Sequence, residues 1–370
     1  MSDKKKTILI LANFSAGLYD FRAELLERLV RDFRIICVIP DETKEAEIRT
    51  LGCQTLITPM SRRGMNPHED LHLYHEYRQI CKEIKPDMVL TFTIKPNVYG
   101  GMVCRRLKIP YISVVTGLGS AFWGSFVKRW LIVLLERRGL KAASCLFFEN
   151  AENMAIFEKY RIHGQKSRLV CGAGVNLKRF PMQPYPQGAD FCFLFIGRIM
   201  KDKGIDEFLA AAEALHGGNV RFQVLGFCED DYQERLNELE GRGVIEQLGF
   251  MADVLEFYER ASAIVLPSYH EGMSNVLLEA ASTGRPVIAS DIAGCREAFD
   301  EGATGLGFRP RDTDDLIRAL EDFMAITLAE RALMGRRGRE KMGKEFDREK
   351  VVAAYVEEIK NVIPNEGDSA

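Results

Sequence analysis

The chain has 370 residues, of which 46% are hydrophobic and 28% are charged. Domains usually contain about 100–200 residues, so this length predicts two of them, and the composition excludes disordered and collagen-like proteins. The nine cysteines are odd in number, widely spread and never in a C-x-x-C arrangement, which predicts buried thiols in a reducing compartment. The first residues show no signal-peptide core, so we expect a cytoplasmic protein.

Charge is distributed unevenly along the chain. Residues 1–180 contain 29 Lys and Arg against 18 Asp and Glu, whereas residues 181–370 contain 21 against 35. This asymmetry has two interpretations: the first half meets an anionic partner such as a lipid surface, a phosphate or a nucleic acid, or the two domains complement each other in charge.

The first half of the chain alternates short apolar runs with helical patterns. Strands are predicted at 7–12, 34–39, 54–58, 87–92, 111–115 and 144–149, and helices at 19–31, 42–51, 70–83, 97–107 and 125–140. Such short, fully apolar runs separated by helices are typical of a parallel sheet that is buried on both faces. The first half is therefore predicted to be a doubly wound α/β domain.

A second series of the same kind follows a proline-rich linker at 180–188. Strands are predicted at 191–196, 221–225, 264–266, 286–289 and 305–308, and helices at 205–215, 230–239 and 275–283. Residues 312–362 form three helical segments. We thus predict an N-terminal domain at 1–178, a C-terminal domain at 179–345, and a final helix within 346–370 that packs back on the N-terminal domain.

The strongest motif consists of two glutamates, Glu271 and Glu279, around the run Gly272, Met273, Ser274 and Asn275. It follows a predicted strand and opens a helix. Free N–H groups and the positive end of a helix at the carboxyl end of a strand suit an anion such as a diphosphate. The alternative is structural: Ser274 or Asn275 caps the helix and Glu279 is a solvated helix residue.

A second strand, glycine turn and helix start lies at residues 195–204. Here Arg198 and Lys203 flank a loop that begins with Gly197. Both cations can converge on phosphate oxygens, each contact contributing about 1.5–3 kcal/mol. The alternative is a surface loop with ordinary basic residues.

These two motifs, together with the segment 174–180, resemble family 4 of the retaining glycosyltransferases. The resemblance implies the GT-B fold: two Rossmann-like, doubly wound domains facing across a cleft, with the C-terminal helix crossing back to the N-terminal domain. It implies that Arg198 and Lys203 bind the donor diphosphate, that Glu271 contacts the donor sugar, and that Glu279 contacts the ribose. The same two motifs supply the further donor-site residues Gly197, Gly272, Met273, Ser274 and Asn275. The resemblance also implies that Gly226 and Phe250 lie near the nucleotide base, and Gly17, after the first predicted strand, would let the backbone approach the donor.

The N-terminal half is similar to the bacterial branch of this family that transfers sugars to polyprenyl-diphosphate-linked acceptors. The matching runs are 61–67, 93–101 and 116–120, and they imply an acceptor site formed by Arg62, Arg63, Lys95, Asn97, Thr116 and Gly117. Many members of the wider family carry a histidine where this chain has Thr116 and Gly117, so no general base is assigned.

The stretch 121–141 combines aromatic and basic residues. Trp123, Phe126 and Trp130 fall on one helical stripe, with Lys128 and Arg129 beside it, as in helices that lie at a membrane interface. Its longest apolar run is far shorter than the roughly 20 residues that span a bilayer. The stripe either contacts a membrane or packs a crossover helix on the sheet.

The resemblance thus implies a retaining, metal-independent hexosyltransferase. It would move a sugar, an N-acetylhexosamine, from a UDP-sugar to a lipid-linked sugar in the assembly of bacterial surface polysaccharide or glycoprotein glycans. We expect no cofactor, no metal and no nucleic acid, and a peripheral location on the inner face of the cytoplasmic membrane. Three alternatives stay open: a nucleotide-sugar epimerase, a non-catalytic nucleotide-sugar-binding protein, and a nicotinamide oxidoreductase, the last disfavoured because G-x-G-x-x-G is missing.

Overall fold

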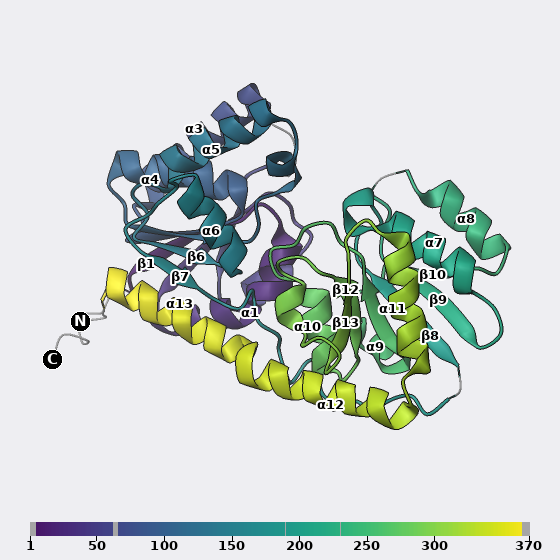
Figure 1. The fold of residues 1–370 in the computed structure, drawn as a ribbon. Coiled ribbons are helices and arrows are strands. Elements are labelled where there is room, and N and C mark those ends of the chain that lie inside the picture. The colour runs from purple at the N-terminus through teal and green to yellow at the C-terminus, as the bar shows by residue number, and fades with distance from the viewer. Residues whose placement is uncertain (1–4, 62–65, 189, 230, 365–370) are drawn as a thin grey trace. The chain divides into compact units, whose positions relative to one another are not determined.

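The computed structural model describes residues 5–61, 66–188, 190–229 and 231–364, without the side chains of residues 120 and 121. The predicted acceptor residues Arg62 and Arg63 therefore lie outside the described residues. Contacts divide the chain into two compact units, residues 1–173 with 348–370, and residues 174–347. Each unit is a parallel sheet covered by helices (Figure 1).

The boundaries between the units differ slightly from the predicted ones at 178 and 345. Val175 forms a bridge with Asp347, and its N–H donates to the carbonyl of Phe346 at 2.8 Å. The two segments that connect the units are thus joined to each other, which places both 174–178 and 346–347 with the second unit.

The first unit contains a seven-stranded parallel sheet with the order β3-β2-β1-β4-β5-β6-β7. Its strands are β1 (Thr7–Leu11), β2 (Arg34–Ile39), β3 (Gln54–Ile57), β4 (Met88–Phe92), β5 (Tyr111–Val115), β6 (Cys145–Phe148) and β7 (Ser167–Leu169). Its helices are α1 (Ser15–Asp32), α2 (Glu45–Thr50), α3 (Pro67–Ile84), η1 (Pro96–Gly100), α4 (Gly101–Leu107), η2 (Ser120–Trp123), α5 (Phe126–Leu140), α6 (Ala151–Lys159) and α13 (Arg348–Val362).

Two apolar layers cover this sheet (Figure 1). One contains α1, α2 and the C-terminal helix α13, and the other contains α3, α4, α5 and α6. The helix α13 is held by an ion pair between Arg348 and Glu24 and by Tyr355, whose ring packs against Phe147. The last helix of the chain is therefore part of the N-terminal unit.

The second unit contains a six-stranded parallel sheet with the order β10-β9-β8-β11-β12-β13. Its strands are β8 (Phe191–Ile196), β9 (Val220–Leu225), β10 (Glu246–Gly249), β11 (Ala263–Leu266), β12 (Val287–Ser290) and β13 (Gly305–Phe308). Its helices are η3 (Lys201–Lys203), α7 (Ile205–Leu215), α8 (Gln233–Gly241), α9 (Leu255–Arg260), α10 (Asn275–Ser282), η4 (Arg296–Ala298), α11 (Thr313–Ala325) and α12 (Leu328–Glu345).

Both sheets have the doubly wound Rossmann order. In this order the first strands are added on one side of the first strand and the later strands on its other side. The switch points lie between β1 and β4 in the first unit and between β8 and β11 in the second. In such sheets ligands bind outside the carboxyl ends of the strands at the switch point. The fold class predicted from the sequence is confirmed for each unit, and the topology indicates where to look for the sites.

One predicted helix has a different form. Residues 97–107 were expected to be a single α-helix, but residues 96–100 form a π-helical turn before α4 begins. Wide turns of this kind occur mostly at functional sites. Periodicity in a sequence does not distinguish one such turn from an α-helix.

Candidate active site

The loops that follow β8 and β9 are in direct contact through two glycines. Gly197 and Gly226 both have φ of 154°, and a Cβ on Gly226 would lie 1.8 Å from the carbonyl oxygen of Gly197. Gly226 therefore has no room for a side chain, whereas a Cβ on Gly197 would lie 3.9 Å from its nearest neighbour, Phe195, so Gly197 is restricted by its φ alone. Gly197 and Gly226 therefore shape the carboxyl ends of β8 and β9, where the sequence placed the donor site.

The predicted cations of the donor site are paired with carboxylates. Nη1 of Arg198 lies 2.6 Å from Oε2 of Glu229, which follows β9. Lys203 forms an ion pair with Glu271, and the hydroxyl of Ser268 donates to Oε1 of that glutamate at 2.8 Å. The fold thus brings Lys203, from the loop after β8, together with Glu271, from the loop after β11, at the switch point.

The start of α10 is closed by its own cap. The hydroxyl of Ser274 accepts from the N–H of Leu277, and the N–H of Ser274 donates to the carbonyl of Gly294 at 2.8 Å. Ser274 is thus the helix cap that the structural alternative described. Met273 is buried, and Oδ1 of Asn275 is buried without a hydrogen-bond partner among the described residues.

The structural alternative also described Glu279 as a solvated helix residue, but its carboxylate has a buried partner. Its Oε2 accepts a hydrogen bond of 2.9 Å from the hydroxyl of Tyr258. Tyr258 is completely buried, and burial together with the neighbouring carboxylate raises the pKa of its phenol well above its ordinary value. The phenol therefore stays protonated and donates.

An aromatic pair lies at the carboxyl ends of β9 and β10. Phe250 is 69% exposed and packs edge to face against Phe227, with a centroid separation of 6.1 Å. The N–H of Gly226 donates to the carbonyl of Gly249 at 2.8 Å, which joins the two loops. Exposed aromatic rings at a strand end can stack on a nucleobase.

In the first unit, Lys95 follows β4 and lies next to an acid. Its Nζ is 2.9 Å from Oδ1 of Asp70, and both side chains are nearly buried. The contact is an ion pair, and among the described residues Oδ1 of Asp70 accepts no hydrogen bond. Tyr99 donates to the same carboxylate. Burial, and to a smaller extent the neighbouring Asp70, raises the pKa of the Tyr99 phenol.

The backbone around Lys95 is strained. Thr93 has φ of 75°, a region that β-branched residues rarely adopt and that persists mostly at functional sites. Gly117 and Gly119, after β5, also have positive φ, and a Cβ on Gly119 would lie 2.7 Å from Cδ1 of Ile94. Gly119 and Ile94, in the loops after β5 and β4, thus lie close together, and Thr116 is half-buried.

Asn97 has a role in the fold that the sequence did not predict. It is 4% exposed; its Nδ2 donates to the carbonyl of Val114, and its Oδ1 accepts from the hydroxyl of Thr91. The side chain joins β4 to β5, so this structure does not place it as an acceptor contact. Gly17 likewise lies inside the first turn of α1, with its nearest neighbour on its own helix region, Phe14.

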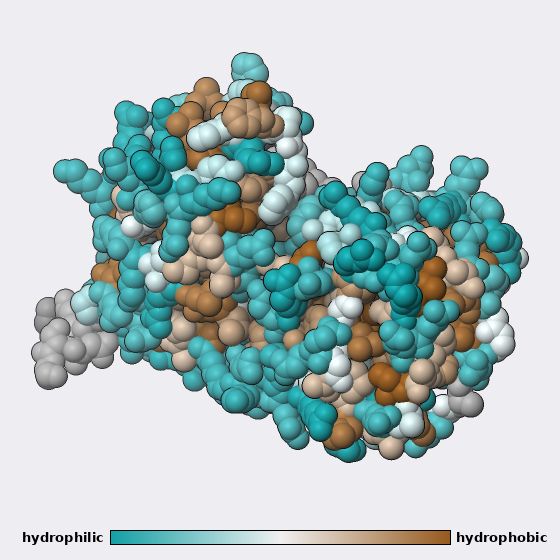
Figure 2. All heavy atoms as spheres, viewed as in Figure 1, coloured by the Kyte–Doolittle hydropathy of each residue, from teal (hydrophilic) through white to brown (hydrophobic). Residues whose placement is uncertain are grey.

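The aromatic stripe of 121–141 is exposed. Trp123, Phe126 and Trp130 are 46%, 72% and 43% exposed, and Lys128 and Arg129 accompany them. The buried face of α5 consists of other residues, Ile132, Val133, Glu136, Gly139 and Leu140. The alternative in which this stripe packs a crossover helix on the sheet is therefore wrong. Figure 2 shows apolar residues on the surface over the part of the first unit that contains α3 and α5.

Glu136 is a carboxyl group on that buried face. It is 3% exposed, and its Oε2 has no hydrogen-bond partner among the described residues. Burial raises the pKa of Glu136 to about 8. The group is thus mostly a neutral carboxylic acid at neutral pH.

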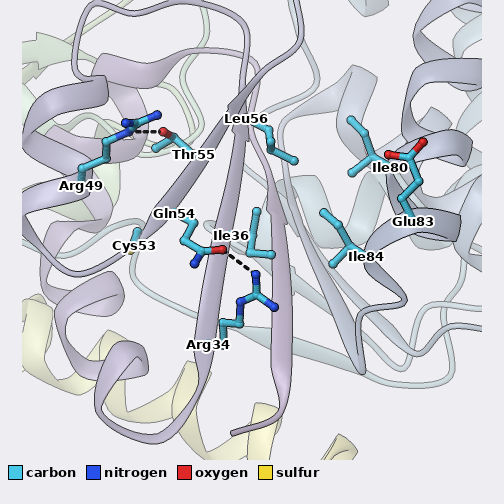
Figure 3. Close-up of a pocket in the computed structure, with 10 residues that line it drawn as sticks. All are labelled: Arg34, Ile36, Arg49, Cys53, Gln54, Thr55, Leu56, Ile80, Glu83 and Ile84. Atoms are coloured by element: carbon cyan, nitrogen blue, oxygen red, sulfur yellow. Dashed lines mark hydrogen bonds between the residues drawn. The ribbon is translucent and has the colours of Figure 1, made fainter. Parts of the chain in front are cut away.

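A pocket of about 540 Å³ lies elsewhere in the first unit, between the edge strand β3, its neighbour β2 and the end of α3 (Figure 3). Its polar side chains bind one another: Arg34 donates to Gln54 and Arg49 donates to Thr55. None of the residues that the sequence singled out lines it.

Among residues 5–61, 66–188, 190–229 and 231–364, no three His, Cys, Asp or Glu side chains are grouped so that they could hold a metal ion. Within the same ranges, every helix is too short or too polar to cross a bilayer.

Two Rossmann-like units, one with paired cations and a helix start at its switch point, define the GT-B class of glycosyltransferases. Family models agree: residues 7–150 match "Glycosyl transferase 4-like" and residues 190–325 match "Glycosyl transferases group 1". The chain belongs to the glycosyltransferases that combine these two domains, as the resemblance to family 4 predicted.

Individual relatives cover most of the chain. A protein of Campylobacter jejuni, the N,N'-diacetylbacillosaminyl-diphospho-undecaprenol alpha-1,3-N-acetylgalactosaminyltransferase, is 26% identical over 83% of this chain and 86% of its own length. The capsular polysaccharide biosynthesis glycosyltransferase CapM of Staphylococcus aureus is 23% identical over 94% of each chain. The structure of Anabaena Alr3699/HepE in complex with UDP-glucose is similar in fold, with a TM-score of 0.80 at 17% identity over 96% of this chain and 99% of that one.

Three residues of these sites were missed from the sequence. Glu229 could have been found as an acid just beyond the carboxyl end of β9. Asp70 and Tyr258 lie on helices, far along the chain from Lys95 and Glu279, and no motif spacing links them to their partners.

Proposed function

We propose that this glycosyltransferase transfers a sugar from a UDP-sugar, with N-acetylhexosamine as the sugar, to a polyprenyl-diphosphate-linked acceptor. The reaction belongs to the assembly of bacterial surface polysaccharide or glycoprotein glycans. The observation that carries the donor side is the ion pair between Lys203 and Glu271 at the switch point of the second unit. Arg198, in the same loop after β8, is paired with Glu229. The Campylobacter relative, named for a diphospho-undecaprenol acceptor, supports the acceptor class.

The donor diphosphate would be bound by charge-assisted hydrogen bonds. Arg198 offers a planar fork of donors and Lys203 a compact ammonium group, while the start of α10 adds a positive helix end. Because Glu229 and Glu271 form ion pairs with these cations, the diphosphate would replace the carboxylates or share the cations with them. Negative charge that develops on the leaving diphosphate would be stabilised by groups already in position.

The transfer would retain the anomeric configuration and need no metal ion. The acceptor hydroxyl would attack from the face of the leaving group and pass its proton to a phosphate oxygen, so no protein base is required. On the acceptor side, Lys95 at the carboxyl end of β4 would bind the lipid diphosphate, with Thr116 and Gly117 beside it.

The test is transfer of labelled sugar from a panel of nucleotide-sugars to a synthetic prenyl-diphosphate-linked sugar, with and without EDTA. We expect transfer from a UDP-N-acetylhexosamine, unaffected by EDTA, and an α-linked product from an α-linked donor, assigned by NMR. Loss of transfer in EDTA would contradict metal independence. Transfer only to water, or conversion of the donor without an acceptor, would favour a hydrolase or an epimerase.

We also propose that the exposed stripe of α5 and η2 binds the inner face of the cytoplasmic membrane, where the acceptor resides. Large exposed aromatic groups flanked by cations suit the interface between lipid headgroups and acyl chains. A double variant, Trp123→Ala with Trp130→Ser, should co-sediment less with anionic vesicles. The matched control is Leu169→Ser, since Leu169 is 53% exposed on β7, outside the stripe; equal sedimentation of both variants would contradict the proposal.

A further inference from the structure

Tyr258 is a buried tyrosine whose only polar atom on the side chain points at a predicted ligand-binding carboxylate. Its side chain is 0% exposed. The hydroxyl donates to Oε2 of Glu279 at 2.9 Å and lies 3.3 Å from the carbonyl of Val276. Both acceptors belong to α10, whereas Tyr258 belongs to α9.

The position of Tyr258 is fixed by its surroundings. Its carbonyl accepts from Nε of Arg285 at 2.8 Å, and Arg285 is itself 1% exposed. The same guanidinium donates to the carbonyl of Pro184 at 2.7 Å, and the ring of Tyr258 packs edge to face against Phe180. The hydroxyl therefore reaches Glu279 from a rigid support.

A glutamate on a helix surface loses side-chain entropy when a ligand fixes its carboxylate. A buried hydroxyl that already binds one carboxylate oxygen removes part of this cost, because it holds the group in one orientation before the ligand arrives. Recognition of a vicinal diol depends on that orientation, since the two hydroxyls must meet the carboxylate together. Hydrogen bonds to charged groups are among the stronger ones in proteins.

We propose that Tyr258 is a positioning residue for the nucleotide: it orients Glu279 so that this carboxylate binds the vicinal hydroxyls of the donor ribose. The inference rests on the proposed function, in which Glu279 contacts the ribose. Tyr258 does not touch the nucleotide. Its effect is confined to the part of the affinity that comes from the diol.

The test is Tyr258→Phe, which removes one oxygen atom and keeps the buried ring. Affinities for UDP, 2′,3′-dideoxy-UDP and inorganic pyrophosphate are measured by calorimetry. We expect UDP to bind about tenfold more weakly to the variant, as loss of one hydrogen bond to a charged group predicts. Dideoxy-UDP and pyrophosphate should bind with unchanged affinity, because neither has the diol.

Two further variants make the result specific. Glu279→Gln should show the same pattern, and adding Tyr258→Phe to it should cause little further loss. Tyr185→Phe is the matched control, because Tyr185 is also a buried tyrosine of the second unit, with its hydroxyl donating to the carbonyl of Ser262 at 2.9 Å. It should leave all three affinities unchanged.

The outcomes separate the two proposals. If the wild-type protein binds UDP and Tyr258→Phe binds UDP and dideoxy-UDP as tightly as wild type does, the inference about Tyr258 is overturned while the proposed function stands. An equal loss for all three ligands would show that the hydroxyl only supports the fold, which also overturns it. If the wild-type protein binds no UDP, the proposed donor is wrong, and the inference falls with it.

Discussion

Lys203 and Glu271 are 68 residues apart in the sequence and follow different strands, yet their side chains form an ion pair. They come together because β8 and β11, the strands that precede them, are neighbours in the sheet. The pair keeps an ammonium group in place at the switch point. The two side chains are only 20% and 12% exposed, so loss of Lys203 would affect the fold as well as the chemistry, because it leaves the mostly buried carboxylate of Glu271 without this cation.

We predict that Lys203→Ala reduces turnover by about 10²–10³, as the loss of one preorganised charge-stabilising group does. The melting temperature should fall as well, because the variant loses a mostly buried ion pair, so turnover is measured well below it. The measurements are the transfer assay described above and thermal unfolding of the same sample. Lys201→Ala provides the control, since Lys201 is an exposed lysine two positions away; turnover close to wild type in Lys203→Ala would remove Lys203 from the site.

Glu136 should make stability depend on pH. Its pKa is about 8 in the folded protein and about 4.5 when unfolded, so between these values the folded state holds a proton that the unfolded state has lost. Stability from this group is therefore complete below pH 4.5 and falls as pH rises, by up to about 1.4 kcal/mol per pH unit. Glu136→Gln cannot ionise and should be more stable than wild type by about 2–4 kcal/mol at pH 8.

Urea unfolding at pH 5 and pH 8 would check this prediction. The two proteins should converge toward pH 5, and the exposed Glu321→Gln should match wild type at both values, because surface substitutions change stability by about 0.5 kcal/mol or less. A constant difference between Glu136→Gln and wild type across this range would contradict the assignment.

At the scale of elements, the most apolar strands could be predicted from the sequence, and so could the edge strands β3 and β13, whereas the edge strands β7 and β10 could not. β1, β4 and β5 are fully buried runs and are recognisable as such. β7 and β10 were missed because they are short and partly exposed, so no apolar run marks them. The π-turn at 96–100 was missed because its residues have the same composition as an α-helix start.

The candidate site divides in the same way. Gly197, Arg198, Lys203 and Glu271 lie in loops at strand ends, where glycines and charges reveal a ligand site. Asp70 and Tyr258 act through side-chain contacts between helices, and a single sequence contains no signal for such pairs. The sequence also could not predict that the α5 stripe is exposed, because its helical periodicity suits a buried face and a membrane-facing face equally.

One aromatic residue contributes much of the packing of α13 on the first unit. Tyr355 is 1% exposed, and its ring centroid lies 4.4 Å from that of Phe147. We predict that Tyr355→Ala destabilises the protein by about 3–5 kcal/mol, because it leaves a large cavity. Tyr355→Phe should be neutral or stabilising, since among the described residues the buried hydroxyl has no hydrogen-bond partner. Denaturant unfolding distinguishes these outcomes, and a large loss in Tyr355→Phe would show that the hydroxyl is bound.

At the scale of the whole molecule, the two units share one topology and differ in charge. Residues 1–180 contain an excess of cations and residues 181–370 an excess of anions. The exposed aromatic stripe belongs to the cationic part of the chain, and so does Lys95. In the proposed function an acidic second half is no obstacle to an anionic donor, because recognition would depend on the local cations Arg198 and Lys203 rather than on net charge. The asymmetry thus favours an anionic surface as the partner of the first unit.

This interpretation predicts how membrane binding responds to salt and lipid. The screening length falls from about 30 Å at 0.01 M ionic strength to about 3 Å at 1 M, so the attraction of Lys and Arg to anionic headgroups, about 1 kcal/mol per residue, should be largely lost. Co-sedimentation with anionic vesicles should therefore fall steeply as NaCl is raised, and binding to zwitterionic vesicles should be weak throughout. The vesicle binding that remains at high salt should disappear in the Trp123→Ala, Trp130→Ser variant, because that binding comes from insertion of the aromatic side chains into the lipid. Binding that ignores both salt and lipid charge would instead favour charge complementarity between the two halves of the chain.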